Sequence, residues 1–338
     1  MSELRQDRTT GAWVIVAPQR GLRPQMRAPG ARCEPRPRFD PKCPFCPGHE
    51  AQLPGIIAET PAREVPGWSV RVVPNKFPAV PATLAAQALT CGGHQAPPGQ
   101  GAHEVIIESP WHDAEPATLS AVELNAAVET YRARSRTLLA QDGIAAVILF
   151  RNYGPRAGAS LAHPHAQIIA LDFVPPKLAA IDDWSRRYTA EHGRCALCAE
   201  LEVERASGTR IVDENDKFVA LVPFAAEHPF ELWVVPKQHE ASFGALADKA
   251  LPAFSDLLGR SLRLLQAALD DPPYNFVVDT APKAELVAPH WHWKLRIVPD
   301  VATWGGFELG AGLPINPSSP EDDAALLRAA PAEHEGRS

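Results

Sequence analysis

The chain has 338 residues, of which 45% are hydrophobic, and this length and composition suit two globular units or one duplicated unit. A net charge of −7 at pH 7 argues against a surface built to neutralise nucleic-acid phosphates, so we expect no nucleic-acid partner. The polar start and the lack of an apolar run approaching ~20 residues indicate neither a secretory signal nor a membrane span, so we expect a cytoplasmic protein.

Apolar alternation and β-branched runs predict strands in both halves of the chain. Residues 20–42, rich in Arg and Pro, predict an extended arm, and residues 91–102 predict a mobile loop. The charged, alanine-rich stretch after Pro320 is expected to end in a frayed tail. The predicted strands are Trp13–Ala17, Trp68–Val73, His103–Glu108, Ala145–Phe150, Gln167–Leu171, Phe218–Val222, Glu231–Val235, Asn275–Val278 and Trp293–Val298.

Two long helices are predicted between these strands. The first begins near Ser120, where Ser-Ala-Val-Glu fits a capping box, and runs to about Gln141 before an Asp-Gly stop. The second spans roughly Leu251–Leu269 and is stopped by two prolines. Each half of the chain therefore contains several strands and one long helix.

The chain contains an internal repeat. His103–His112 aligns without gaps with Phe230–His239, and each segment follows a Cys-x-x-Cys pair and precedes a long helix. After each helix come a strand, a loop and a His-x-His pair, whose first histidine lies 51 residues beyond the aligned segment (163 − 112 and 290 − 239). These coincidences predict a duplicated α+β unit with a boundary near residues 172–192, and we divide the chain into residues 1–175 and 176–338.

Two cysteine pairs indicate metal sites. In a reducing compartment, Cys-x-x-Cys suggests metal ligands or a redox pair more than a structural disulfide. Structural zinc takes four tetrahedral thiolate and imidazole ligands, and such a closed sphere leaves no position for a reacting water, so we expect a structural role. Iron also accepts these ligands. The candidates are Cys43, Cys46, His112 and His163 in one site, and Cys195, Cys198 and His239 with His290 or His292 in the other.

The run His163-Pro-His165-Ala-Gln167 predicts a reaction centre, because its three polar side chains share one face of a strand. An imidazole is a competent nucleophile near neutral pH and can form a covalent phosphoramidate when its other ring N–H is held by an acceptor. The preceding loop, rich in Gly and small residues, can bring backbone N–H groups and the Ser160 hydroxyl to phosphate oxygens. We therefore expect His165 to attack phosphorus and Gln167 to donate to a non-bridging oxygen.

The same run resembles the signature of the galactose-1-phosphate uridylyltransferase branch of the histidine-triad superfamily. The resemblance covers nearly the whole chain and implies an α+β fold of two histidine-triad-like domains, each an antiparallel sheet with a long helix packed on it. The first domain is then catalytic and the second is degenerate. The further matching segments are Cys43-Pro-Phe-Cys46, Asn75-Lys-Phe-Pro-Ala79, Ser109-Pro-Trp-His112, Asn152-Tyr-Gly154 and Gly305-Gly-Phe-Glu308.

The resemblance implies a ping-pong transfer of UMP between UDP-glucose and galactose 1-phosphate through a uridylyl-His165 intermediate, in a homodimer. The alternative is an ADP-glucose phosphorylase or adenylyltransferase that uses the same histidine. A nucleotide hydrolase of the superfamily is a third hypothesis. A zinc-stabilised binding module is the fourth, and it would have no need of His165.

The resemblance also assigns roles to further residues. Gln167 stabilises the nucleotidylated enzyme, and Glu308 lies by the sugar, in some family dimers across the subunit interface. In the branch that carries Cys195-x-x-Cys198, the fourth ligand of the second site matches His292, and we expect this residue although the repeat spacing favours His290. The remaining matches are Arg20 and Arg23 on the N-terminal arm, Asn75 near the uridine, and Asn152, Gly158 and Ser160 in the phosphate loop.

In the second repeat, Lys294 is expected at the place that Gln167 takes in the first, and no Gly/Ser loop precedes it. We therefore expect the second half to have lost catalysis and to serve as a scaffold.

Overall fold

The first half of the chain forms one side of a long antiparallel sheet. The structure is a computed structural model that describes residues 2–22, 33, 35–62, 67–80, 89–91, 94–96 and 99–331. In the register of this half, Val105 lies opposite Gln167 and Ile107 lies opposite His165. The strands are β3 (Ala58–Pro61), β4 (Trp68–Pro74), β7 (Gly101–Ile107), β8 (Ala146–Tyr153) and β9 (His165–Leu171).

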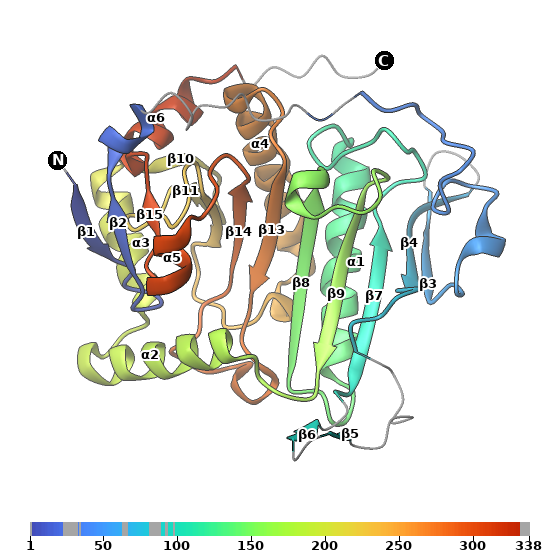
Figure 1. Cartoon of the computed structure of the whole chain (residues 1–338), viewed down its shortest axis with the longest axis horizontal. Coiled ribbons are helices and arrows are strands. Elements are labelled where there is room, and N and C mark those ends of the chain that lie inside the picture. The colour runs from blue at the N-terminus through green and yellow to red at the C-terminus, as the bar shows by residue number, and fades with distance from the viewer. Residues whose placement is uncertain are drawn as a thin grey trace.

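The second half repeats this arrangement with β10 (Ile211–Glu214), β11 (Phe218–Leu221), β12 (Leu232–Pro236), β13 (Tyr274–Asp279) and β14 (Lys294–Pro299). The combined sheet has the order β10-β11-β12-β14-β13-β8-β9-β7-β4-β3 (Figure 1). Counted outward from the seam between β8 and β13, the strands run β8-β9-β7-β4-β3 in the first half and β13-β14-β12-β11-β10 in the second. The strands correspond one to one in chain order, which confirms the duplicated α+β fold. Asn152 and Asn275 face each other across the seam. The division at residues 175 and 176 stays a prediction.

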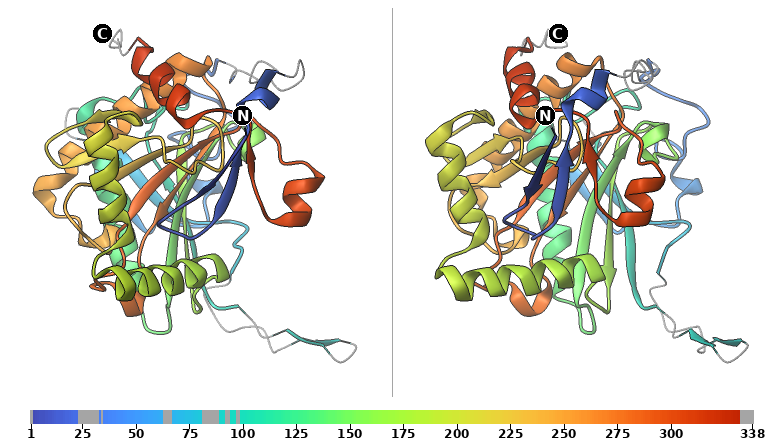
Figure 2. Two further views of the ribbon diagram at one scale, coloured as in Figure 1. Left: turned by 90° about the vertical axis from the view of Figure 1, so that its left-hand side faces the viewer. Right: turned by 60° about the vertical axis from the view of Figure 1, so that its left-hand side comes forward.

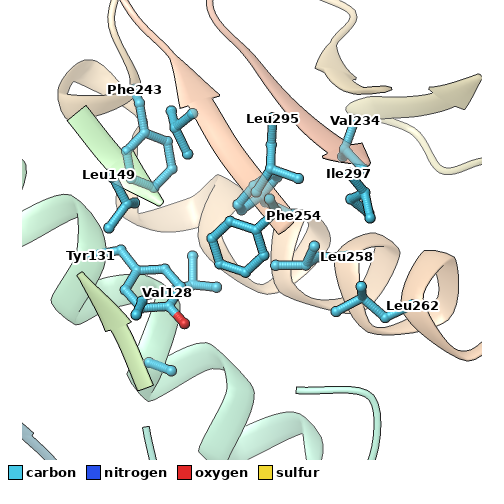
Figure 3. Packing of buried hydrophobic residues seen from close by; sticks show 14 of the residues in the cluster. Val128, Tyr131, Leu149, Val234, Phe243, Phe254, Leu258, Leu262, Leu295 and Ile297 are labelled. Atoms are coloured by element: carbon cyan, nitrogen blue, oxygen red, sulfur yellow. The ribbon is translucent and has the colours of Figure 1, made fainter. Parts of the chain in front are cut away.

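Two long helices cover one face of the sheet, α1 (Ala121–Leu139) and α4 (Leu251–Leu269), close to their predicted bounds (Figure 1). Ser120 caps α1 through the predicted capping box with Glu123. Between helices and sheet, Tyr131 of α1 and Phe254 of α4 lie in one cluster with buried side chains of β8 and β14 (Figure 3). Each large side chain buried there contributes roughly 1.5–3 kcal/mol to the stability of the fold. Because the cluster contains side chains from both halves, the two halves share one core.

Several elements were not predicted from the sequence. Strands β1 (Glu3–Gln6) and β15 (Ile315–Asn316) were not predicted, and they form a small sheet with the predicted strand β2 (Trp13–Val16). The additional helices are α2 (Pro176–His192), α3 (Ala196–Ser207), α5 (Gly306–Ala311) and α6 (Pro320–Ala329). Single 3-10 turns occupy Pro18–Leu22, Glu50–Gln52, Pro155–Ala157, Phe243–Ala245, Asp248–Ala250 and Lys283–Glu285.

The N-terminal hairpin of β1 and β2 lies against the second half of the chain (Figure 2). Lys294 of β14 donates to the Thr9 hydroxyl at 3.1 Å, and Trp184 of α2 donates to the Arg8 carbonyl at 2.8 Å. Arg5 forms an ion pair with Glu321 of α6 at 2.9 Å. The first residues of the chain thus cover β14, far along the sequence.

The loop predicted over residues 91–102 is partly wrong. Strand β5 (Leu89–Cys91) pairs with β6 (His94–Ala96) in a hairpin that projects from the body, and β7 already begins at Gly101 (Figure 2). The arm is free of helix and strand over residues 35–42, as expected. None of the helices within the described ranges has the length and hydropathy that a bilayer crossing requires.

Candidate active site and metal clusters

His165, the first residue of β9, has its ring in one defined tautomer. Its Nδ1 lies 2.8 Å from the backbone oxygen of His163, an acceptor, so Nδ1 carries the hydrogen and Nε2 keeps its lone pair. The side chain is only 5% exposed, and burial lowers the pKa of His165, which favours the neutral ring near pH 7. A neutral, oriented imidazole is the form that can act as a nucleophile.

A cavity of about 410 Å³ lies beside His165. Its polar lining includes Gln167 and Ser160, and the ring of Phe45 meets His165 edge-on with centroids 5.5 Å apart. The apolar lining suits a flat aromatic group, because ligand pockets combine apolar walls with a few placed polar groups. The remaining lining residues are Pro44, Gln52, Leu53, Pro54, Val73, Pro74, Asn75, Lys76, Phe77, Val105 and Leu161.

The carboxamide of Gln167 is held by two neighbouring side chains. Its Oε1 lies 2.8 Å from Nε2 of His103 and accepts from Nδ2 of Asn75 at 3.2 Å. Asn75, predicted to lie near the base, does line the cavity. His103 was not singled out from the sequence. It lies on β7 two positions from Val105, the residue opposite Gln167, so only the strand register brings it to the site.

The predicted phosphate loop lies between β8 and β9. Asn152 donates to the Gly158 carbonyl at 3.3 Å, and Gly158 has a left-handed φ of +88° that favours glycine. Asn275, from the second half, donates to Asn152 at 2.8 Å and to the Ala157 carbonyl at 2.7 Å. Sequence reasoning missed Asn275, because it reaches the loop only across the seam between the halves. Ser160 lines the cavity of His165 and a second cavity of about 500 Å³.

A buried ionic network supports this loop from the core side. Arg151, 1% exposed, donates to Glu108 at 2.9 Å and also to Glu115. Arg36 donates to Glu115 and to the carbonyl of Ala162, directly before the His-Pro-His run. Buried charges that are paired and hydrogen-bonded hold one geometry, so the network fixes β8 relative to the loop.

Four predicted ligands form a compact cluster in the first half. Their ligand atoms all lie within 4.8 Å of one another, and this arrangement could hold a metal ion. The Nδ1 of His163 is 3.7 Å from each sulfur of Cys43 and Cys46, and the Nδ1 of His112 is 3.6 Å from Cys46. His163 donates its Nε2–H to the Ser109 carbonyl at 2.8 Å, which turns the lone pair of Nδ1 toward the sulfurs.

The second cluster consists of Cys195, Cys198, His239 and His292. The sulfur of Cys198 lies 3.3 Å and 3.4 Å from the Nδ1 atoms of the two histidines. His290, which the repeat spacing favoured, is not part of this cluster. It donates instead to Asp182 at 2.8 Å.

In the second half, the residue equivalent to His163 lies two positions later than the gapless alignment places it. His292 donates to the Pro236 carbonyl at 3.0 Å as His163 does to Ser109, and β14 begins two residues after His292, as β9 does after His163. The equivalent spacing is therefore 292 − 239 = 53 residues. Lys294 consequently takes the place of His165, so its expected equivalence with Gln167 was wrong.

Two predicted binding residues do not join this site. Arg20 lies in the 3-10 turn after β2 and Glu308 in α5, and neither lines the two cavities described above. Glu308 accepts from the Gly305 N–H at 2.9 Å within its own helix. Arg23 lies outside the described residues.

Comparison with known proteins relates the chain to sugar-nucleotide enzymes. Residues 1–175 match the family described as galactose-1-phosphate uridyl transferase, N-terminal domain. An ADP-glucose phosphorylase from Arabidopsis thaliana is 36% identical over 330 residues, which span 96% of this chain and 92% of the relative. A galactose-1-phosphate uridylyltransferase from Thermotoga maritima is 27% identical and spans 97% and 98% of the two chains. A crystal structure of the Arabidopsis thaliana phosphorylase with bound ADP-glucose has a TM-score of 0.83 at 34% identity, covering 98% and 99%.

Proposed function

Because the chain belongs to the galactose-1-phosphate uridylyltransferase family of nucleotidyltransferases, we propose that His165 carries a nucleoside monophosphate between two sugar phosphates. The observation that carries the proposal is the ring of His165, whose Nδ1–H is held by the His163 carbonyl at 2.8 Å beside a cavity lined by Gln167 and Ser160. The leading donor and acceptor are UDP-glucose and galactose 1-phosphate, as for the family's galactose-1-phosphate uridylyltransferases.

The reaction takes two displacements at one phosphorus. Nε2 of His165 attacks the α-phosphorus of UDP-glucose, the P–N bond forms, and the bond to the β-phosphate oxygen breaks to release glucose 1-phosphate. A phosphate oxygen of galactose 1-phosphate then attacks the same phosphorus, the P–N bond breaks, and UDP-galactose leaves with neutral His165 restored. Gln167, Ser160 and the backbone N–H groups of the loop stabilise the charge on the non-bridging oxygens.

Adenylyl transfer from ADP-glucose to phosphate is the second candidate. It is favoured by the 36% identity with the Arabidopsis thaliana ADP-glucose phosphorylase, which extends over both halves of the fold. The chemistry at His165 is unchanged, since AMP replaces UMP on the histidine and a phosphate oxygen replaces the sugar phosphate as acceptor. The products are glucose 1-phosphate and ADP.

Covalent labelling separates the two candidates. The purified chain is incubated with UDP-glucose or ADP-glucose labelled at the α-phosphorus, and protein-bound label is then challenged with galactose 1-phosphate or inorganic phosphate. Label from UDP-glucose that galactose 1-phosphate discharges supports the leading function, and label from ADP-glucose that phosphate discharges supports the second. No label from either donor, or equal label in His165→Asn, would contradict the nucleotidyl-histidine proposal itself.

Zinc in both clusters is part of the proposal. Tetrahedral zinc with S and N bonds of about 2.3 and 2.0–2.1 Å sets its sulfur and nitrogen ligands about 3.6 Å apart. The distances of 3.6–3.7 Å in the first cluster and 3.3–3.4 Å in the second fit this spacing. Zinc there would hold the His163 backbone in place, and with it the carbonyl that orients His165.

A homodimer that completes the sugar site is also proposed. Glu308 lies on α5, outside the cavity of its own His165, and the helix exposes Phe307 by 50% and Leu309 by 74%. Exposed apolar side chains beside a polar one suit a subunit interface, which would bring Glu308 to the partner's cavity. A cytoplasmic location stays a prediction.

Mixing two inactive variants tests the shared site. If Glu308 acts across the interface, subunits carrying His165→Asn and Glu308→Gln should together regain about a quarter of wild-type activity, because half of randomly mixed dimers hold one intact site. Either variant alone should stay inactive. The two variants carry different affinity tags, and a mixture that remains inactive although sequential purification on both tags recovers mixed dimers would contradict the arrangement.

A further inference from the structure

Two donors converge on the side-chain oxygen of Gln167, and each is fixed by the backbone of one short loop. Asn75 accepts from the Phe77 N–H at 2.8 Å through its Oδ1, which turns its amide nitrogen toward Gln167. His103 accepts from the Ala79 N–H at 3.1 Å through Nδ1. Residues 75–79 therefore set the direction of both side chains.

The Ala79 contact also decides the tautomer of His103. A backbone N–H can only donate, so Nδ1 must be unprotonated and the neutral ring carries its hydrogen on Nε2. Burial supports this form, since it lowers the pKa of His103. Nε2–H then donates to Gln167 Oε1 at 2.8 Å. The 3.1 Å approach of the Asn75 amide nitrogen to His103 Nε2 is a contact between two donors that share one acceptor.

The orientation of Gln167 follows from these assignments. With Oε1 occupied by two donors, the amide nitrogen of Gln167 lies on the other side of its carboxamide, and it makes no hydrogen bond to any residue in the described ranges. A flipped amide would place NH₂ against two donors and is disfavoured by the loss of both hydrogen bonds. Gln167 thus presents N–H groups, and not an oxygen, to the cavity that it shares with His165.

We propose that His103 is a positioning residue of the transfer reaction, which fixes the Gln167 amide so that its N–H groups meet the non-bridging oxygens of the α-phosphate. This inference rests on the proposed nucleotidyl-His165 chemistry and deepens it. An oxyanion donor is effective when it is oriented before the charge develops, whereas a carbonyl oxygen aimed at a phosphate would repel it. His103 therefore acts on the rate of phosphorus transfer and not on binding of the sugar.

The test compares three substitutions at one position. His103→Leu removes the donor, His103→Gln keeps an amide donor at nearly the reach of Nε2, and His103→Asn is polar but too short to meet Gln167. Single-turnover labelling by the donor chosen in the experiment above gives the rate of covalent bond formation and the donor concentration at half-saturation. We expect His103→Leu to lower the rate about tenfold with half-saturation changed less than twofold, the effect of losing one orienting hydrogen bond. His103→Gln should recover most of the rate and His103→Asn should not.

A double-mutant cycle separates positioning from a general structural effect. In the Gln167→Leu background there is no amide to orient, so adding His103→Leu should lower the labelling rate less than twofold further. A full tenfold loss in that background would overturn the proposal, as would wild-type labelling in His103→Leu. Should the leucine variant fail to fold, equal rates in His103→Gln and His103→Asn would overturn it too. Wild-type chain that takes no label would remove the proposed function together with this inference, whereas the other outcomes remove this inference alone.

Discussion

At the scale of single residues, one amino acid links the first Cys₂His₂ cluster to the proposed nucleophile. The ring of His163 faces two cysteine sulfurs, while its backbone carbonyl accepts the Nδ1–H of His165 at 2.8 Å. A metal ion bound by His163 would therefore also hold in place the carbonyl that fixes the tautomer of His165. This arrangement explains why two histidines with different tasks occur only two positions apart on one strand.

Substitution of Lys294 tests the expectation that the second half has no reaction centre. It takes the place of His165, but its Nζ lies 4.0 Å over the Trp233 ring and donates to Thr9, and the adjoining cavity is only about 150 Å³. Ligand pockets typically measure about 300–1,000 Å³, so no nucleotide fits there. We predict that Lys294→His in the His165→Asn background takes no label from either donor. Label above that of His165→Asn alone would contradict the assignment of the second half as scaffold.

Site residues were predictable from the sequence where their type and their spacing along the chain indicate a function. The cysteine pairs and their histidines stand out by the spacing of metal ligands, and His165 and Gln167 stand out because polar groups on one face of an apolar strand are poor core material. His103 and Asn275 did not stand out, since one depends on strand register and the other on the seam between halves. The shift of two residues before His292 was also beyond a gapless alignment.

At the scale of elements, the N-terminal hairpin closes the face of the second half. It is anchored to α6 by Glu321, which pairs with Arg5 at 2.9 Å and with Arg210 at 2.7 Å. Burial by itself raises the pKa of this carboxyl, but the hydrogen bonds from the two arginines outweigh it and lower the pKa to about 2. The ion pair therefore links a segment from the start of the chain to one near its end.

This pKa gives a pH-dependent prediction. Because the folded pKa lies below the value near 4.5 of an unperturbed Glu, the contribution of Glu321 to stability is present above about pH 4.5 and is lost as the pH falls toward 2. In urea unfolding, Glu321→Gln should therefore be less stable than wild type at pH 6, and the difference should shrink at pH 3. A difference that stays constant or grows on acidification would refute the ion-pair account.

The elements themselves were predictable where the sequence pattern is strong. The periodic helices α1 and α4 and the apolar strands lie within a few residues of their predicted bounds. Helix α2 was missed because it is largely exposed and polar, with Leu178 and Ser185 its buried residues, so it shows no wide apolar stripe. Helix α3 does bury one face, which includes Leu197 and Leu201, but the sequence analysis did not pick it out. Strand β15 pairs with β2 at the other end of the sequence, whereas β1 and β3 pair with the next strand along the chain but are only four residues long.

At the scale of the whole molecule, we propose that duplication has left catalysis to the first half and a structural role to the second. Both halves keep a Cys₂His₂ cluster and a long helix on a shared sheet, but only the first half keeps an imidazole at the start of its fourth strand from the outer edge. The second half contributes Asn275 to the predicted phosphate loop. The place in the second half that corresponds to His165 is covered by the N-terminal hairpin. In the proposed function, the second half therefore supports the first half without a reaction centre of its own.

Removing one metal ligand from each half should show this division. Cys46→Ala and Cys198→Ala should each lose one zinc per chain and unfold at a lower temperature, because metal binding is coupled to folding. Only Cys46→Ala should also lose labelling of the folded fraction, since its cluster contains His163. Metal analysis, thermal melts and label per folded chain check this. Unchanged zinc content in either variant, or equal loss of labelling in both, would contradict the account.

The most direct test of the central claim is to locate the covalent adduct. The chain is incubated with UDP-glucose or ADP-glucose, quenched and digested at alkaline pH, where a phosphoramidate survives, and the peptides are sequenced by mass spectrometry. We predict one nucleoside monophosphate per chain, attached to His165, discharged by the acceptor and absent from His165→Asn. Turnover of the wild-type chain with no adduct, or with an adduct on another residue, would contradict the claim that His165 is the nucleophile.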